Sequence, residues 1–290
     1  MNWDFSPQIL IQGINQDQAI SYLQNCPWAK EIVVAGIADE YVGDAIEDIP
    51  IFDLVSSAID AYPDITTSLI FSQSEQVLDV CYEAIFAGIK QVVIFSGDIP
   101  IIDLMSLYQK AQEKNVHILG SSGGGILQSQ SQYNCGINHG HLIGAGNIGM
   151  INFAHPNLAE EIVGFLQKAD FGISSLINVG NSYFSDINWD LCLNILQKDV
   201  NTELIIIIIS EISLAETEKL IGAVSPITDL PITIYLVNSQ DYRSQILGNP
   251  PKVISDQVYN YLEPRSSLEL LQSHNFADNI TITNNYKNII

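Results

Sequence analysis

Short runs of β-branched and other apolar residues alternate with longer amphipathic stretches along most of this 290-residue chain. The apolar runs are nearly continuous, which is typical of strands covered on both faces of a parallel sheet. They predict strands at 8–13, 31–36, 67–72, 91–96, 116–120, 148–153, 174–180, 203–209 and 232–237. Helical periodicity predicts helices between them at 17–25, 53–61, 75–88, 101–114, 157–168, 188–197, 213–224 and 255–271. This order restricts the chain to an α/β fold with right-handed crossovers.

A Gly- and Ser-rich stretch from Ser121 to Gly149 has no clear helical pattern and divides the repeats into two sets. We therefore expect two doubly wound domains with mainly parallel sheets, over residues 1–143 and 144–274. The polar, Asn-rich segment 275–290 is predicted to be a C-terminal tail or an added edge strand.

The charge of the chain is strongly unbalanced, with 33 Asp and Glu against 11 Lys and Arg, a net charge of −22. Such a surface repels phosphate backbones and anionic lipids, so neither nucleic acid nor a membrane is an expected partner. No secretory signal is recognised, and the longest apolar run, Leu204–Ile209, is too short to span a bilayer. The four cysteines are widely spaced, which favours reduced thiols in a cytoplasmic protein and predicts no metal site.

One motif, Gly144-x-Gly146-x-x-Gly149, has the spacing of a dinucleotide-binding fingerprint. The fingerprint needs a strand before its first glycine and a helix that begins at its third. Here the preceding residues form a weak strand pattern, and Pro156 delays the next helix to about residue 157. An NAD-dependent redox protein is therefore one hypothesis for this chain, and it is less favoured than the two hypotheses described below.

Three longer segments carry a family resemblance: "GIKQVVIFSGDIPIIDL" (88–104), "INHGHLIGAGNIGM" (137–150) and "LQKDVNTELIIIIISEI" (196–212). They resemble the α subunit of succinyl-CoA synthetase and related NDP-forming acyl-CoA synthetases. The resemblance implies an N-terminal Rossmann-like CoA-binding-type domain followed by a flavodoxin-like ligase domain. It also implies CoA as a ligand, a transiently phosphorylated histidine and an ATP-grasp β subunit as partner.

The CoA-binding positions that the resemblance implies are altered here. The candidates are Gly13, Asn15, Gln18, Tyr41, Ser96 and Gly97. Two glycines of the family's phosphate loop are absent, and Tyr41 stands in place of a phosphate-binding lysine, beside Asp39 and Glu40. We therefore expect no bound cofactor, with CoA as the alternative.

The catalytic positions that the resemblance implies are altered as well. Asn249 stands in place of the nucleophilic histidine, and an amide nitrogen is not a nucleophile. Glu211 is retained from the family's pattern, and His155 is a weak replacement candidate whose ordinary alternative is a residue at a helix start. The loop of Ser121, Ser122, Gly123 and Gly124 is a candidate anion-binding nest.

Two further hypotheses follow from these residues. The first is a catalytically degenerate α-like subunit, a structural or regulatory component of a complex with an ATP-grasp β-like subunit or with a second copy of itself. The alternative is an acyl-CoA ligase or an acyl or carbamoyl transferase with altered chemistry in the same pocket and no phosphohistidine.

Overall fold

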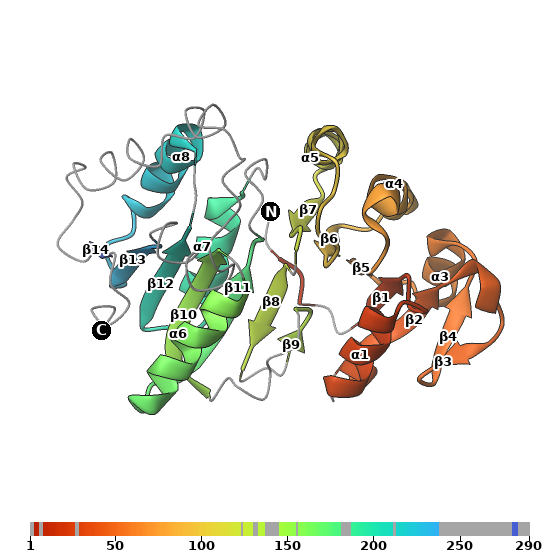
Figure 1. Ribbon diagram of the computed structural model, residues 1–290, viewed down its shortest axis with the longest axis horizontal. Helices are drawn as coiled ribbons and strands as arrows, with labels where there is room; N and C mark the ends of the chain where they lie inside the picture. The colour runs from red at the N-terminus through yellow and green to blue at the C-terminus, as the bar shows by residue number, and fades with distance from the viewer. Residues whose placement is uncertain are drawn as a thin grey trace, which may run out of the picture. The chain divides into compact units, whose positions relative to one another are not determined.

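The computed structural model describes residues 3–5, 8–26, 29–122, 124–129, 133–136, 145–154, 156–180, 187–210, 213–237 and 280–283. The chain forms two compact units (Figure 1). The first unit comprises Met1–Ile143 and Ile177–Ser185, and the second comprises Gly144–Leu176 and Asp186–Ile290. The domain limits 1–143, 144–274 and 275–290 given by the sequence analysis remain a proposal.

The first unit contains a doubly wound sheet with strand order β3-β4-β2-β1-β5-β6-β7. Its parallel strands are β1 (Ile9–Gln12), β2 (Val33–Ile37), β4 (Ile49–Phe52), β5 (Thr67–Ile70), β6 (Gln91–Ile94) and β7 (His117–Leu119). The short β3 (Ala45–Ile46) is antiparallel to β4 at one edge. Counted along the chain, the parallel strands follow the Rossmann order 3-2-1-4-5-6, which confirms the predicted fold class.

Helices cover both faces of this sheet. Figure 1 shows α3 (Val55–Ala61), α4 (Val77–Ala87) and α5 (Ile101–Lys114) on one face and α1 (Asp17–Asn25) on the other. Short helical segments α2 (Ala29–Ile32), η1 (Asp39–Tyr41) and η2 (Ser74–Gln76) complete the unit. The apolar faces of α3, α4 and α5 pack on the sheet in one buried cluster that includes Val55, Cys81 and Leu107. Gly88 ends α4 with φ of 106°, the left-handed cap expected at this position.

A hairpin of β8 (Gly125–Gln128) and β9 (Tyr133–Asn134) lies within the stretch that shows no helical pattern. The sequence analysis missed these two strands and also β3 and β4. β3 and β4 form one antiparallel pair and β8 and β9 another, so neither pairing belongs to the strand–helix alternation on which the prediction depends. β4 also contains Pro50, a residue that strands tolerate mainly at edges.

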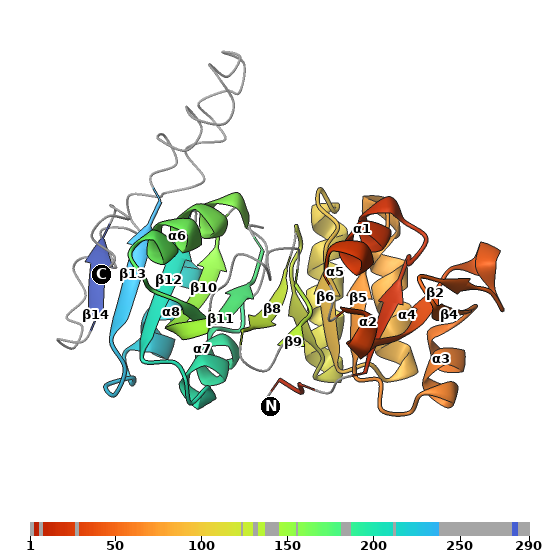
Figure 2. The ribbon, with the colours of Figure 1, turned by 90° about the horizontal axis from the view of Figure 1, so that it is seen from below.

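The second unit contains a sheet with strand order β14-β13-β12-β10-β11, which Figure 2 shows side by side. The strands are β10 (Ala145–Phe153), β11 (Ile173–Asn178), β12 (Leu204–Ile209), β13 (Ile232–Leu236) and β14 (Ile280–Thr283). Counted along the chain this is the flavodoxin-like order 2-1-3-4-5, as predicted. β14 pairs in parallel with β13, so the last segment supplies an edge strand.

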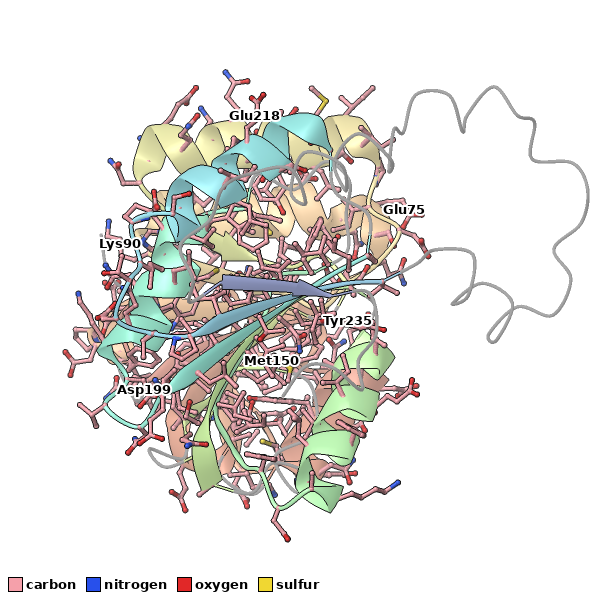
Figure 3. The ribbon with its side chains drawn as sticks, turned by 90° about the vertical axis from the view of Figure 1, so that its left-hand side faces the viewer. Glu75, Lys90, Met150, Asp199, Glu218 and Tyr235 are labelled. Carbon is pink, nitrogen blue, oxygen red and sulfur yellow. The ribbon has the colours of Figure 1, made fainter. Side chains whose placement is uncertain are left out.

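Three helices cover this second sheet: α6 (Pro156–Lys168), α7 (Trp189–Lys198) and α8 (Leu214–Val224). Figure 3 shows α6 and α8 on opposite faces, with Glu218 on the solvent side of α8. α7 packs against α8 and β10. The predicted helix at 255–271 lies outside the described residues.

Gly146 and Gly149 of the glycine motif lie inside β10 and not in a strand-to-helix turn, and Gly144 lies outside the described residues. A Cβ on Gly146 would lie 2.1 Å from the carbonyl carbon of Gly172, and one on Gly149 would lie 2.9 Å from Cγ2 of Thr202. These two glycines therefore permit close packing of a strand. The next helix begins only at Pro156, so the motif lacks the geometry of a dinucleotide fingerprint.

Candidate functional site

The carboxyl ends of the parallel strands in the first unit meet along one edge of the sheet, here called the carboxyl edge. Strand order reverses between β1 and β5, and open α/β sheets bind ligands outside the carboxyl ends at such a point. Six segments follow the strands at this edge, here called its loops although they include the first residues of α1 and the short η1 and η2: 13–18, 38–44, 53–54, 71–76, 95–100 and 120–124. Every candidate CoA position and the candidate anion loop lie in these loops.

Gly13 ends β1 with its backbone close to the next strand across the reversal point. Its φ is 76°, and a Cβ there would lie 1.9 Å from the carbonyl oxygen of Phe71. The Gly13 amide donates to the carbonyl oxygen of Ile37 at 3.1 Å, and its carbonyl oxygen accepts from the amide of Gln16 at 3.0 Å. Only glycine fits this turn, because any side chain would collide with backbone.

A serine network joins the loops after β5, β6 and β7. The Ser96 hydroxyl is buried and donates to the carbonyl oxygen of Ser72 at 2.5 Å, while the Ser72 amide donates back to Ser96 Oγ at 3.2 Å. The Ser74 hydroxyl donates to the carbonyl oxygen of Gly97 at 2.7 Å. Ser72 Oγ itself is buried and has no hydrogen-bond partner among the described residues. Ser72 was not among the predicted site residues, although it is the last residue of the predicted strand 67–72, as Ser96 is of the predicted strand 91–96.

Two amides of the candidate anion loop already donate to carbonyl oxygens of the protein. The Ser122 amide donates to the oxygen of Ser96 at 2.9 Å, and the Gly124 amide donates to the oxygen of Ile94 at 3.4 Å. A Cβ on Gly124 would lie 2.4 Å from the backbone nitrogen of Gly120, so the loop folds tightly on itself. These two amides hold the loop to the end of β6. They are therefore not free to bind an anion, which argues against an anion nest here. Ser121 is buried, and Gly123 lies outside the described residues.

The remaining candidates of the first unit follow β1 and β2 and form no hydrogen bond with this network. Asn15 is half-buried, and Gln18 is exposed in the first turn of α1. Tyr41 is 41% exposed at the end of η1, behind the exposed Asp39 and Glu40. Among the described residues, no hydrogen bond links these three candidates to Ser96 or Ser122. The structure therefore places all candidates on one edge but brings only the serine loops into contact.

Comparison with known proteins gives relatives for both units. The CoA binding domain family matches residues 6–97. The α subunit of an ADP-forming succinate–CoA ligase from Aquifex aeolicus is 27% identical, over 85% of this chain and 80% of the relative. A subunit of an ADP-forming sulfoacetate–CoA ligase from Acholeplasma sp is 25% identical, over 71% of this chain and 69% of the relative. The CoA binding domain match and these ligase subunits support a relationship to the family of succinyl-CoA synthetase α subunits and NDP-forming acyl-CoA synthetases.

Solved structures show the same fold as this chain. The apo dinucleotide-forming acetyl-coenzyme A synthetase 1 of Ca. Korarchaeum cryptofilum matches with a TM-score of 0.72 and 20% identity. The match covers 98% of this chain and 60% of the solved one. The ATP citrate lyase of Methanothrix soehngenii, in complex with citrate and coenzyme A, has a TM-score of 0.66 at 15% identity. That match covers 85% of this chain and 42% of the lyase, so this chain spans only part of either protein.

The charges on the carboxyl edge of the first unit do not fit a polyphosphate. Its six loops contain no Lys or Arg, but they contain seven exposed acidic residues: Asp17, Asp39, Glu40, Asp44, Asp53, Glu75 and Asp98. The lysines of the first unit lie elsewhere: Lys30 on α2, Lys90 just before β6, and Lys110 and Lys114 on α5. Figure 3 shows Glu75 and Lys90 on opposite sides of the unit. The CoA phosphates would therefore meet carboxylates.

The catalytic candidates of the second unit, His155, Glu211 and Asn249, lie outside the described residues. Across the described part of the chain, no three His, Cys, Asp or Glu side chains gather as metal ligands would. The described helices also include none with the length and apolar character to cross a membrane.

The four cysteines are buried and free. Burial raises the pKa of the Cys135 thiol to about 11 and that of the Cys192 thiol to about 12. Burial also raises the pKa values of the Cys81 and Cys26 thiols. A thiol is nucleophilic only as a thiolate, so none of them is a nucleophile at neutral pH.

Proposed function

We propose that this chain is an α-like subunit that keeps the synthetase fold but no longer catalyses ligation. It acts as a structural or regulatory component of a complex with an ATP-grasp β-like subunit or with a second copy of itself. The observation that carries this proposal is the carboxyl edge, where seven acidic residues and no basic residue lie in the segments to which the family resemblance assigns the CoA phosphates.

Electrostatics explains why this edge opposes CoA. Two like charges 8 Å apart repel by roughly 0.5 kcal/mol in water, and seven carboxylates act together on a ligand with several negative charges. The neutral pantetheine arm experiences no such repulsion. Loss of binding should therefore be greatest for the phosphate-bearing end of the cofactor.

The second support is the nucleophile that the family resemblance assigns. Asn249 stands at the position of the phosphorylated histidine, and its amide nitrogen is conjugated with a carbonyl group. The retained Glu211 can orient a nucleophile but cannot replace one. The altered CoA edge and the altered nucleophile are independent changes, and either alone is enough to stop the reaction.

The test combines the full chain with an ATP-grasp subunit from the same organism, ATP and CoA. We expect no acyl-CoA product and no acid-labile, base-stable phosphate on the chain. Asn249→His alone should not restore turnover, because the CoA edge is still acidic. Either product formation or phosphorylation of the wild-type chain would refute the proposal.

A charge variant tests the edge directly. Asp39→Asn, Glu40→Gln and Tyr41→Lys together remove two charges and add a basic group at the position of the family's lysine. We expect calorimetry to show CoA binding at least about tenfold tighter than for the wild type. Glu31→Gln and Glu113→Gln, on helices away from the edge, should leave CoA affinity unchanged.

One observation favours the second hypothesis, an enzyme with altered chemistry. The close approach of Gly13 to Phe71 is intact, and the CoA binding domain family matches around it. Thermal-shift measurements with CoA, acyl-CoAs, pantetheine and carbamoyl phosphate separate the hypotheses, because strong stabilisation by an acyl-CoA or by carbamoyl phosphate would support the enzyme.

A further inference from the structure

The indole N–H of Trp189 is a buried donor without a partner. Trp189 is the first residue of α7 and is 2% exposed. Its Nε1 has no hydrogen-bond acceptor among the described residues. By contrast, the buried indole of Trp3 donates to the hydroxyl of Tyr133 at 3.3 Å. Buried tryptophans normally pair this N–H, since an unpaired donor loses its bonds to water without replacement.

This donor lies where strand order reverses in the second unit. Its ring packs edge to face with Phe153, the last residue of β10, at 6.3 Å between centroids. The carbonyl oxygen of Phe153 accepts from the amide of Ser210, just after β12, at 3.0 Å. β10 and β12 are neighbours, and the helices that follow them, α6 and α8, cover opposite faces of the sheet (Figure 3). Ligands of open α/β sheets bind in the crevice at such a reversal.

A buried acceptor without a partner lies at the same edge of the second sheet. Glu216 is in the first turn of α8 and is 8% exposed. One of its oxygens, Oε1, pairs with Nζ of Lys219 at 2.6 Å. The other, Oε2, is buried and has no partner among the described residues. Since α8 packs against α7, the donor and the acceptor belong to the first turns of adjacent helices.

We propose that this edge of the second sheet binds a small ligand with a carboxamide group. The carbonyl oxygen of the amide accepts from Trp189 Nε1, and its N–H donates to Glu216 Oε2. A carboxamide carries both complementary groups, whereas an ionised carboxylate or phosphate offers no donor to Glu216 and is repelled by its charge. This proposal is independent of whether the first unit binds CoA.

The first experiment follows the indole N–H resonances of the ¹⁵N-labelled full chain by NMR. The Trp189 signal is assigned as the one lost in Trp189→Phe. We expect propionamide or L-glutamine to shift it saturably and to leave the Trp3 signal in place, while propionate and inorganic phosphate shift neither. Absence of a saturable shift with both amides, or an equal shift with propionate, would overturn the proposal.

The second experiment measures amide affinity in matched variants. Trp189→Phe keeps most of the buried ring and removes the donor. Its affinity for propionamide should therefore fall about tenfold or more. Trp3→Phe is the control for loss of a buried indole and should bind as the wild type does. Glu216→Met should also weaken binding, whereas Glu218→Met, on the solvent side of the same helix, should not. Unchanged affinity in Trp189→Phe, with its fold verified by circular dichroism, would contradict the proposal.

Discussion

At the scale of single residues, Gly13 shows how backbone geometry limits this fold. The strand β1 ends in a turn with φ of 76°, and the adjacent loop backbone at Phe71 occupies the space of a side chain. Gly43 has a similar φ of 87°, but no atom lies within 4 Å of its missing Cβ. A side chain at Gly43 would meet only an unfavourable dihedral angle, whereas a side chain at Gly13 would also collide with backbone. Substitutions at the two positions therefore separate these two effects on stability.

Replacement of these glycines by alanine should give unequal losses of stability. Gly43→Ala incurs only the left-handed backbone penalty, about 1–2 kcal/mol. Gly13→Ala adds a collision with the Phe71 carbonyl oxygen, so we expect a loss of roughly 3 kcal/mol or more. Urea unfolding followed by fluorescence measures both values. Equal losses would show that the approach of Gly13 to Phe71 is looser than described.

The buried thiols make stability depend on alkaline pH. The pKa of Cys192 is about 12 in the folded chain, because burial disfavours the thiolate, whereas an exposed thiol titrates near about 8.5. The stabilisation from keeping this proton is complete below about pH 8.5 and is lost as the pH rises toward 12.

We therefore expect the stability gap between the wild type and Cys192→Ala to narrow with pH. Above about pH 9 the free energy of unfolding of the wild type should fall relative to the variant by up to about 1.4 kcal/mol per pH unit. Urea titrations at pH 7, 9 and 10 give the gap. Because tyrosine and lysine titrations occur in both proteins, they cancel, and a gap that stays constant with pH would contradict this expectation.

At the scale of helices and strands, the caps differ between the two units. In the second unit, Asn188 Oδ1 accepts from the amide of Leu191 at 2.9 Å and Ser213 Oγ accepts from the amide of Glu216 at 3.1 Å. In the first unit, Gln16 and Gln76 precede α1 and α4 without any side-chain bond to the helix. Side-chain caps therefore stabilise α7 and α8 but not α1 or α4.

Alanine substitution at these positions should follow that difference. Asn188→Ala and Ser213→Ala should each lower the free energy of unfolding by about 1 kcal/mol, because an amide at the helix start loses its acceptor. Gln76→Ala is the matched control and should change it by less than about 0.5 kcal/mol. Chemical denaturation measures all three. A loss in Gln76→Ala as large as in the capped positions would mean that helix propensity dominates.

Sequence patterns predicted the regular elements well and the site only in part. α1 and α5 have the predicted bounds, because their apolar spacing and their ends are both well marked. The strands β3, β4, β8 and β9 were missed, because they form two antiparallel pairs outside the strand–helix alternation on which the prediction depends. Because Gly13 and Ser96 stand at the ends of predicted strands, the sequence locates both at one edge of the sheet. The hydrogen bond between Ser96 and Ser72 could not be predicted, because it requires knowing which strands are neighbours. The unpaired atoms of Trp189 and Glu216 depend on packing and have no sequence signature.

At the scale of the whole molecule, charge is the dominant property. The chain has a net charge of −22, and few cations are available to pair with its carboxylates. Ion pairs such as Lys30–Glu47 and Lys110–Glu113 lie on exposed surface, where each contributes little. Most acidic groups therefore repel one another in the folded state.

Added salt should stabilise this chain. Between 10 mM and 500 mM NaCl the screening length falls several-fold, so self-repulsion weakens more in the compact state than in the expanded one. We expect the thermal midpoint to rise by a few degrees, measured by circular dichroism. Sucrose at equal osmolality controls for solvent exclusion. A midpoint that falls with NaCl would show that attractive ion pairs outweigh repulsion.

The separation of charge in the first unit has a kinetic consequence. The strand ends carry carboxylates without a lysine, whereas the strand starts carry three of the four lysines beside acidic residues such as Glu31 and Asp64, so the unit has an electric moment along its strands. A cationic molecule that diffuses nearby experiences a torque before any contact forms. It therefore reaches the ends of β1 and β5 first, and the order of encounter is set by long-range forces and not by the shape of the loops.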